Sequence, residues 1–596
     1  MAITRPFPFI LRISLTLALC LTASLLPVIA TAAADCRTGE QSHVWTAPQH
    51  PQPGDPLEVM AVATDGVLDQ LLVTDPTGRH TTLRGTPNGG PPWSLAGTLF
   101  RPTAGTYRIE AARNGQVVAC EDIEIGGMAN RPDSHAWNLA TEAFYAAWIE
   151  HLFDAPPDQS LSADSLAPFL RNPERNFLYN SQGAGEDNRL PAAPDCADLP
   201  YFLRSYFAWK LGLPVAYRAC GRGSRSNPPR CEAQVIEQRF TNAPVSATSF
   251  REVSQQIINT VHSGSARTGL TDEATDFYPV SLERESLWPG TIYADPYGHV
   301  LILVKWIPQR GNQSGLLLAV DAQPDNSVTR KRFWEGTFLF AQTPSSGPGF
   351  KAFRPLVQTG SGMRPASNNA LDGSNGLPPY STAQARLAPD DFYARMEQLI
   401  NPDGLSPETA YESTLDALME QLETRITSVN NGETYMRAHP GATVSMPSGS
   451  AIFETIGPWE DYATPSRDMR LLIAMKVLKG LPDRIRRYPQ LYDLLGENSE
   501  TAAVRIERLH DQRLDERFIT YTRSDGSPSR LSLRDLYRRR AGLEVGYNPN
   551  DCVERRWGTT PDTPDNATCR RQAPLEQQTR MEDYRAWFHD TVRPPR

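Results

Sequence analysis

The cysteine spacing constrains this chain most, because it divides the sequence into segments that can be cross-linked separately. Residues 1–34 have the pattern of a signal peptide, with two arginines, an apolar run and small residues at the end. Export to an oxidising compartment, periplasmic or extracellular, would let the remaining cysteines pair. Six of them predict three local disulfides: Cys36–Cys120, Cys220–Cys231 and Cys552–Cys569.

One cysteine of the exported chain is left over. This residue, Cys196, has no neighbouring cysteine in the sequence to pair with. An odd thiol in an exported protein is either a partner for another chain or a reactive group. Its local sequence, discussed below, favours the second interpretation.

Composition excludes two classes of protein. The chain has 59 basic and 68 acidic residues, a formal net charge of −9, whereas nucleic-acid binding requires clustered Lys and Arg. After the signal peptide, no apolar stretch approaches the roughly 18 residues that span a bilayer. We therefore expect neither nucleic-acid binding nor stable membrane insertion, while the oligomeric state stays open.

The 596 residues suggest roughly three or four domains. Residues 36–127 predict an all-β sandwich, because apolar residues alternate along Leu57–Ala63 and Tyr107–Ala111 and the pair Asn114-Gly115 offers a tight hairpin turn. The phrase Gly105-Thr106-Tyr107 resembles immunoglobulin-like modules of exported bacterial proteins.

The rest of the chain divides by composition and periodicity. Residues 134–360 mix helical and strand patterns and predict an α+β domain. Residues 361–386 are rich in Ser, Gly, Pro and Asn and predict a linker or a long covering loop. Residues 387–596 follow helical spacing and predict a mostly α region.

Cys196 lies at the predicted start of a helix. Pro200 is tolerated only in a first helical turn, which fixes that start, and Asp195 is suited to cap it. A thiol at this position faces unpaired backbone N–H groups and the positive end of the helix dipole, which favour the nucleophilic thiolate. An apolar stripe defines the buried face of the helix: Leu199, Phe202, Leu203, Tyr206, Phe207 and Leu211.

A nucleophilic cysteine needs a base and an orienting group. His299 immediately precedes the β run 300–304, and Asp321 ends the next β run, 316–320. If the two runs form a hairpin, Asp321 returns to the His299 end and holds the imidazole tautomer. Asp295 is the rival orienter because it is close to His299 in sequence, although it equally suits a turn.

This order of residues resembles the transglutaminase-like branch of the papain-like cysteine hydrolase fold, over about residues 190–325. The resemblance implies Cys196 as nucleophile, His299 as general base and Asp321 as orienter. The sequence departs from the family in Gly298-His299-Val300, where His-Ala-Trp is common, and in the long gap between the cysteine and the histidine. The subfamily is therefore left unassigned.

An oxyanion hole would use the Cys196 backbone N–H and a polar side chain upstream, for which Asn180 and Gln182 are the candidates. We expect no metal site and no cofactor, because no His/Cys cluster has ligand spacing.

These residues predict an exported cysteine hydrolase that cleaves amide bonds in peptides, proteins or the peptide stems of peptidoglycan. One alternative is a transglutaminase, in which an amine takes the acyl group in place of water. The other is a non-catalytic binding or scaffold protein of the cell envelope, with an unreactive Cys196.

Overall fold

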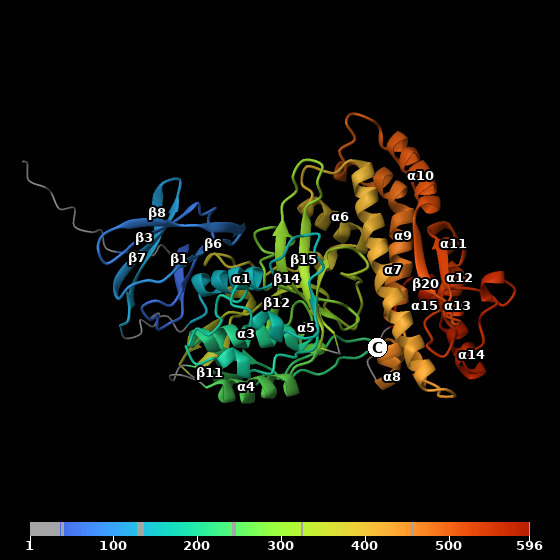
Figure 1. Cartoon of the computed structure of the whole chain (residues 1–596), viewed down its shortest axis with the longest axis horizontal. Coiled ribbons are helices and arrows are strands. Elements are labelled where there is room, and N and C mark those ends of the chain that lie inside the picture. Colours follow the sequence, from blue (N-terminus) through green and yellow to red (C-terminus); the bar gives the residue numbers. More distant parts are fainter. Residues whose placement is uncertain are drawn as a thin grey trace, which may run out of the picture.

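The chain forms a mixed α/β molecule of several parts, arranged in a row (Figure 1). A β-rich part, a central sheet with helices and a mainly helical part follow one another from the N-terminus. Within the described residues, no helix is both long enough and apolar enough to cross a membrane. The predicted signal peptide lies outside the described residues. The computed structural model describes residues 36, 41–127, 136–240, 246–323, 326–360, 362–454 and 457–594.

The first eight strands form two four-stranded antiparallel sheets. Alternate residues such as Val59, Ala61 and Ile109 are fully buried between them, as the period of two requires. Asn114 and Gly115, both with positive φ, form the tight turn between the last two strands. In sheet order the strands are β1 (Ser42–Ala47), β2 (Leu57–Ala63), β6 (Trp93–Leu99) and β5 (Gly85–Gly89), then β4 (His80–Leu83), β3 (Gln70–Thr74), β7 (Gly105–Arg113) and β8 (Gln116–Ile125).

A seven-stranded antiparallel sheet forms the centre of the molecule. The predicted hairpin is present, with Ile302 opposite Val320, so that the end of one strand returns to the start of the other. In sheet order the strands are β12 (Phe277–Pro279), β17 (Gly349–Phe353), β13 (Ile292–Ala294), β14 (Val300–Ile307), β15 (Leu316–Ala322), β16 (Val328–Arg332) and β9 (Ser162–Ala163).

Different helices cover the two faces of this sheet. One face, including Val300 and Ile302, belongs to the same core as α1 (Leu139–Leu152) and α3 (Asp198–Leu211). The other face, including Leu301, packs with α6 (Pro389–Ile400). Smaller elements complete this part: α2 (Ala167–Leu170), β10 (Pro214–Tyr217), β11 (Ile236–Arg239), α4 (Ala247–Thr260), α5 (Ser263–Ala266), β18 (Leu356–Thr359) and β19 (Gly362–Pro365).

The segment 361–386 is packed onto the central part, so the prediction of a linker needs correction. Its Ala366, Leu371 and Leu377 are buried, and the Ser381 N–H donates to the Pro279 carbonyl of the sheet. The segment is therefore a covering loop, the alternative that its composition left open. Its regular elements are short, such as β19 (Gly362–Pro365), but several of its side chains are buried.

The C-terminal part is built around three long helices, α7 (Pro407–Ala438), α9 (Pro465–Arg487) and α10 (Ser499–Glu516), with a separate apolar core. It is not wholly helical, because β20 (Phe518–Thr522) and β21 (Pro528–Ser532) form an antiparallel hairpin within it. The shorter helices are α8 (Gly457–Tyr462), α11 (Leu533–Arg538), α12 (Arg540–Leu543), α13 (Val553–Arg556), α14 (Leu575–Asp583) and α15 (Arg585–His589).

The three predicted cysteine pairs are disulfides. Cys36–Cys120 lies in the β-rich part, Cys220–Cys231 in the central part and Cys552–Cys569 in the C-terminal part. Disulfides persist in oxidising compartments, so these bonds are consistent with an exported protein.

Candidate active site

Cys196 is a free, partly exposed thiol in the turn that leads into α3. One carboxylate oxygen of Asp195 accepts hydrogen bonds from the N–H groups of Ala197 (2.9 Å) and Asp198 (3.1 Å). The Asp195 carbonyl accepts from the Leu199 N–H, so helical hydrogen bonding begins at Asp195. Cys196 is thus the first residue after a carboxylate cap, at the positive end of the helix.

His299 lies between Cys196 and Asp321. Its Nε2 donates to Asp321 Oδ2 over 2.9 Å, and the side chain of Cys196 is close enough to raise the pKa of the ring. Because Nε2 of His299 donates to Asp321, the ring nitrogen available to the sulfur of Cys196 is Nδ1. The three residues come from α3, from the start of β14 and from β15, and the hairpin register brings the last two together.

The charge state of the histidine follows from these contacts. Burial alone would lower the pKa of His299, but its hydrogen bonds to Asp321 and Cys196 raise it to about 9. Burial would raise the pKa of Asp321, yet the positive charges of Lys331, His299 and Arg470 together lower it. The geometry therefore favours an imidazolium next to an ionised carboxylate at neutral pH.

Gln323 is a residue of the site that sequence analysis missed. Its Nε2 donates over 2.7 Å to Asp321 Oδ2, the same oxygen that His299 binds, and so helps to fix the carboxylate. The only signal in the sequence is its position two residues after Asp321.

Asp295, the rival orienter, serves the turn before His299. Its Oδ1 accepts from the Tyr297 N–H, and its own N–H donates to the His299 carbonyl over 2.9 Å. These bonds hold the backbone on which His299 is placed. Asp321, and not Asp295, is the carboxylate that contacts the imidazole.

Asn180 and Gln182, the candidate oxyanion donors, belong to a loop that is held from the C-terminal end of α3. Ser181, between them, accepts from the Gln49 N–H, while the Gln49 side chain donates to the Lys210 carbonyl. Lys210 follows Cys196 by fourteen residues, about 20 Å along a helix.

The physical reason is a buried ion cluster at the far end of α3. Lys210 Nζ contacts Glu186 at 2.5 Å and Asp187 at 2.8 Å, and all three side chains are almost fully buried. The N–H groups of Asn180 and Gln182 donate to these carboxylates. The loop is therefore held by Lys210, and its polar residues serve this cluster.

A second carboxyl group lies close to the thiol. Asp198, two residues after Cys196, is only 7% exposed, and burial together with the neighbouring Asp195 raises its pKa to about 8. Around neutral pH, Asp198 is therefore a proton donor at the entrance of α3. The Asp-Cys-Ala-Asp pattern was the available signal for it.

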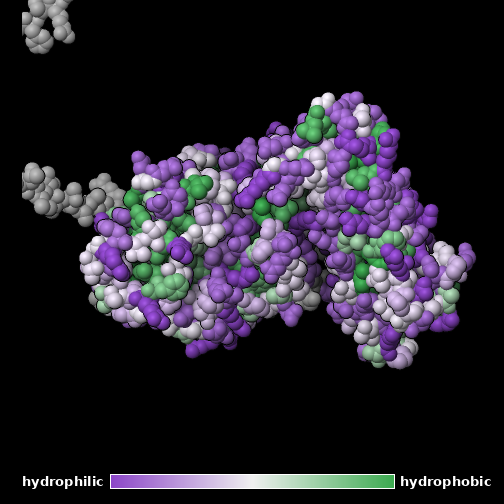
Figure 2. Space-filling model, turned by 45° about the horizontal axis from the view of Figure 1, so that its top comes forward, coloured by the Kyte–Doolittle hydropathy of each residue, from purple (hydrophilic) through white to green (hydrophobic). Residues whose placement is uncertain are grey.

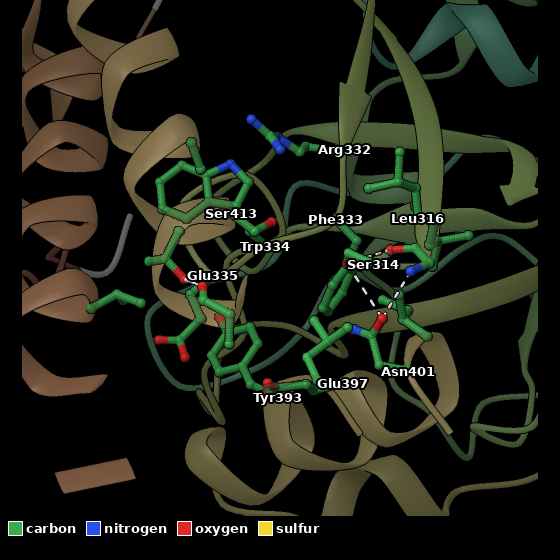
Figure 3. Close-up of a pocket in the computed structure, with 18 of the residues that line it drawn as sticks. Ser314, Leu316, Arg332, Phe333, Trp334, Glu335, Tyr393, Glu397, Asn401 and Ser413 are labelled. Atoms are coloured by element: carbon green, nitrogen blue, oxygen red, sulfur yellow. Dashed lines mark hydrogen bonds between the residues drawn. The ribbon is translucent and has the colours of Figure 1, made fainter. Parts of the chain in front are cut away.

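Two cavities lie where the central part meets the C-terminal helices. One has a volume of about 140 Å³ and is bordered by Trp334, Glu335, Tyr393 and Asn401, with Ser413 of α7 on the helical side (Figure 3). The other is a cleft of about 470 Å³ along α9, and its lining includes Tyr297, two residues before His299.

The described residues include one group with the composition of a metal site, Cys552, Glu554 and Cys569. Its two cysteines are joined in a disulfide, and it lies in the C-terminal part of the chain.

Comparison with known proteins gives no matching family model and no significant match to a curated protein or a solved structure.

Proposed function

We propose that this protein is an exported cysteine hydrolase that cleaves amide bonds in peptides, proteins or the peptide stems of peptidoglycan. One observation carries the proposal: a free, partly exposed thiol lies close enough to His299 to act on its pKa, and a buried carboxylate holds the Nε2 of that histidine. A nucleophile, a base and an orienting group in this order are the components of covalent acyl transfer.

The proposed reaction proceeds in two steps. The Cys196 thiolate attacks the amide carbonyl, and the Cys196 N–H at the start of α3 donates to the developing oxyanion. The His299 imidazolium then protonates the leaving amine as the C–N bond breaks, which leaves an acyl thioester. Neutral His299 takes a proton from water, the hydroxide adds to the thioester, and the C–S bond breaks to release the acid.

The finer fold assignment is part of this proposal. The central part would belong to the transglutaminase-like branch of the papain-like fold, with a cysteine before a helix, a histidine before a strand and an aspartate on the next strand. The N-terminal sandwich would be immunoglobulin-like. Both assignments rest on the order and pairing of elements described above.

The direct test is hydrolysis of defined amides by the mature protein. A peptide mixture and purified peptidoglycan are incubated with wild-type protein and with Cys196→Ala, and new amino termini are quantified by mass spectrometry. We expect cleavage of at least one substrate by the wild type and none above background by the variant. Cleavage that survives Cys196→Ala would exclude the mechanism.

The same assay with an added fluorescent primary amine separates hydrolysis from transamidation. Hydrolysis predicts free acids and little incorporated amine. Predominant amine incorporation would assign a transglutaminase, whereas an inert protein with an unreactive Cys196 would assign the scaffold role.

A further inference from the structure

The cleft along α9 runs nearly the whole length of that helix. The residues of α9 that line it recur at helical spacing, from Met469, Ile473 and Lys476 to Arg487. The opposite wall contains the segment 339–341 and the start of α6. The chain segment 590–593 also lines the cleft, and its Arg593 lies over the Tyr297 ring. Figure 2 shows the molecule indented between its central and C-terminal parts.

One end of the cleft adjoins the candidate active site. Tyr297, which lines it, is part of the turn that positions His299. Arg470, next to Met469 on α9, is close enough to act electrostatically on Asp321. The cleft therefore approaches the Cys196–His299–Asp321 arrangement through Tyr297 and the start of α9, although none of the three residues lines it.

The length of the cleft fits a chain better than a small molecule. The nineteen residues from Met469 to Arg487 span about 27 Å of helix. An extended polypeptide rises about 3.3 Å per residue, so about eight of its residues fit along this distance. The cleft also shares Glu335, Tyr393 and Arg484 with the lining of the smaller cavity in Figure 3.

Gly480 keeps the cleft open at its centre. A glycine in the middle of a helix destabilises it, because glycine loses more backbone freedom on folding than other residues. A Cβ atom built on Gly480 would meet no atom within 4 Å. The missing side chain thus leaves room on the lining of the cleft, where the backbone of a ligand can approach.

The lining contains charged side chains of both signs as well as apolar side chains. Lys476, Arg487 and Arg593 are interspersed with acidic residues such as Asp390 and Asp483. Asp390 pairs with Arg487 within the lining, so the cleft has no uniform positive charge that would favour an anionic polymer over a polypeptide with mixed charges. Tyr297, Tyr488, Ile473 and Val477 provide contacts for apolar side chains.

From this length, opening and lining we propose that the cleft binds an extended polypeptide and presents it to Cys196. The proposal deepens the proposed function and rests on it for the chemistry. The bound chain would lie along α9, with its scissile amide next to Tyr297 and His299. The substrate is then an unfolded protein or a long peptide rather than a peptidoglycan stem.

A binding experiment tests the cleft without requiring catalysis. Reduced, carboxymethylated casein carrying a fluorophore is titrated with the full chain bearing Cys196→Ala, and fluorescence anisotropy is recorded. Adding Gly480→Trp or Lys476→Trp, which fill the cleft at two points, should weaken binding at least tenfold. Lys479→Trp, an exposed neighbour outside the lining, should change the affinity less than twofold.

Three results would overturn the proposal. These are no binding of casein, equal binding by the cleft variants, and the same loss in Lys479→Trp. Binding of purified peptidoglycan in place of casein, with the same sensitivity to the cleft variants, would overturn the substrate class. The use of two cleft variants keeps the test valid if one of them does not fold.

An activity measurement separates this proposal from the proposed function. The kcat/KM values for casein and for a dipeptide anilide are compared in a Cys196-intact background. The ratio of casein to anilide should fall at least tenfold in Lys476→Trp and stay constant in Lys479→Trp. If neither substrate is cleaved by the wild type, the proposed function fails, and the anisotropy result still decides whether the cleft binds polypeptide.

Discussion

At the scale of single residues, Cys196, His299 and Asp321 could be predicted, but the residues around them could not. Cys196 follows from the cysteine count and the position of Pro200, and the other two follow from one hairpin, whose pairing is local. The oxyanion role of Asn180 and Gln182 stays a prediction, and the buried side chain of Lys210 holds the carboxylates that bind their loop. A long-range ion cluster of this kind leaves no periodic signal in the sequence.

The carboxylate of Asp321 should determine the pKa and the tautomer of His299. In Asp321→Asn, the imidazole loses its charged partner, so the pKa of His299 should fall and the favoured tautomer should change. We expect kcat/KM for amide hydrolysis to drop by about 100-fold or more. Gln323→Ala, which removes only the second contact to Asp321, should lower kcat/KM much less. Equal activity of Asp321→Asn and wild type would exclude the orienting role.

The same contacts predict a pH-dependent stability. The pKa of His299 is raised to about 9 from the ordinary value of about 6.5, so its protonation stabilises the folded state. That stabilisation is complete below pH about 6.5 and is lost as the pH rises through about 9. For Asp321, whose pKa is lowered, the contribution exists above pH about 4 and is lost as the pH falls further.

Thermal unfolding measures this effect. The Tm difference between wild type and His299→Gln should be larger at pH 7 than at pH 10. His50→Gln, at an exposed position of the β-rich part, provides the control and should give the same small difference at both values. A difference for His299→Gln that stays constant or grows with pH would contradict the charged state assigned to His299.

At the scale of elements, the strands and long helices follow their sequence patterns because each buries one apolar face. The packing of residues 361–386 could not be predicted in this way. Leu371 and Leu377 are buried there, but the surrounding Gly, Pro and Ser residues give no periodic pattern. The hairpin β20–β21 within the C-terminal part was missed because long helices surround it. Whether such short strands form depends on their packing against distant segments of the chain.

The helix α3 depends on its buried lysine. Lys210→Met leaves Glu186 and Asp187 buried without their partner, and breaking a buried pair in this way costs about 3–5 kcal/mol. We expect a corresponding loss of Tm in calorimetry. Arg487→Met removes an exposed ion pair with Asp390 and should cost less than about 1 kcal/mol. Similar losses in the two variants would contradict the role of the cluster.

At the scale of the whole molecule, polar contacts link the central part to the C-terminal helices. Arg484 of α9 binds Glu397 of α6 (2.8 Å) and Glu335 (3.2 Å), and it lies between the two cavities. The sequence around Arg484 does not reveal these partners, because they belong to other elements. Burial raises the pKa of Glu335 to about 7, although the positive charge of Arg484 acts in the opposite direction.

Removing Arg484 should loosen this junction. In Arg484→Met, the pKa of Glu335 should rise further, and the unfolding free energy should fall by about 1–3 kcal/mol, between the values for exposed and buried pairs. The loss of Tm should be greater at pH 8 than at pH 5, where Glu335 is protonated in both proteins. An effect independent of pH would mean that the ion pair does not stabilise the junction.

The central claim of this account is that Cys196 and His299 form a reactive pair, and thiol alkylation tests it most directly. The mature protein is treated with iodoacetamide at pH 6, where an ordinary cysteine thiol (pKa about 8.5) is almost entirely protonated, and the adduct is mapped by mass spectrometry. We predict rapid labelling of Cys196 in the wild type and at least tenfold slower labelling in His299→Ala. Labelling that is slow at pH 6 and unaffected by His299→Ala would contradict the account and leave the molecule as a non-catalytic scaffold.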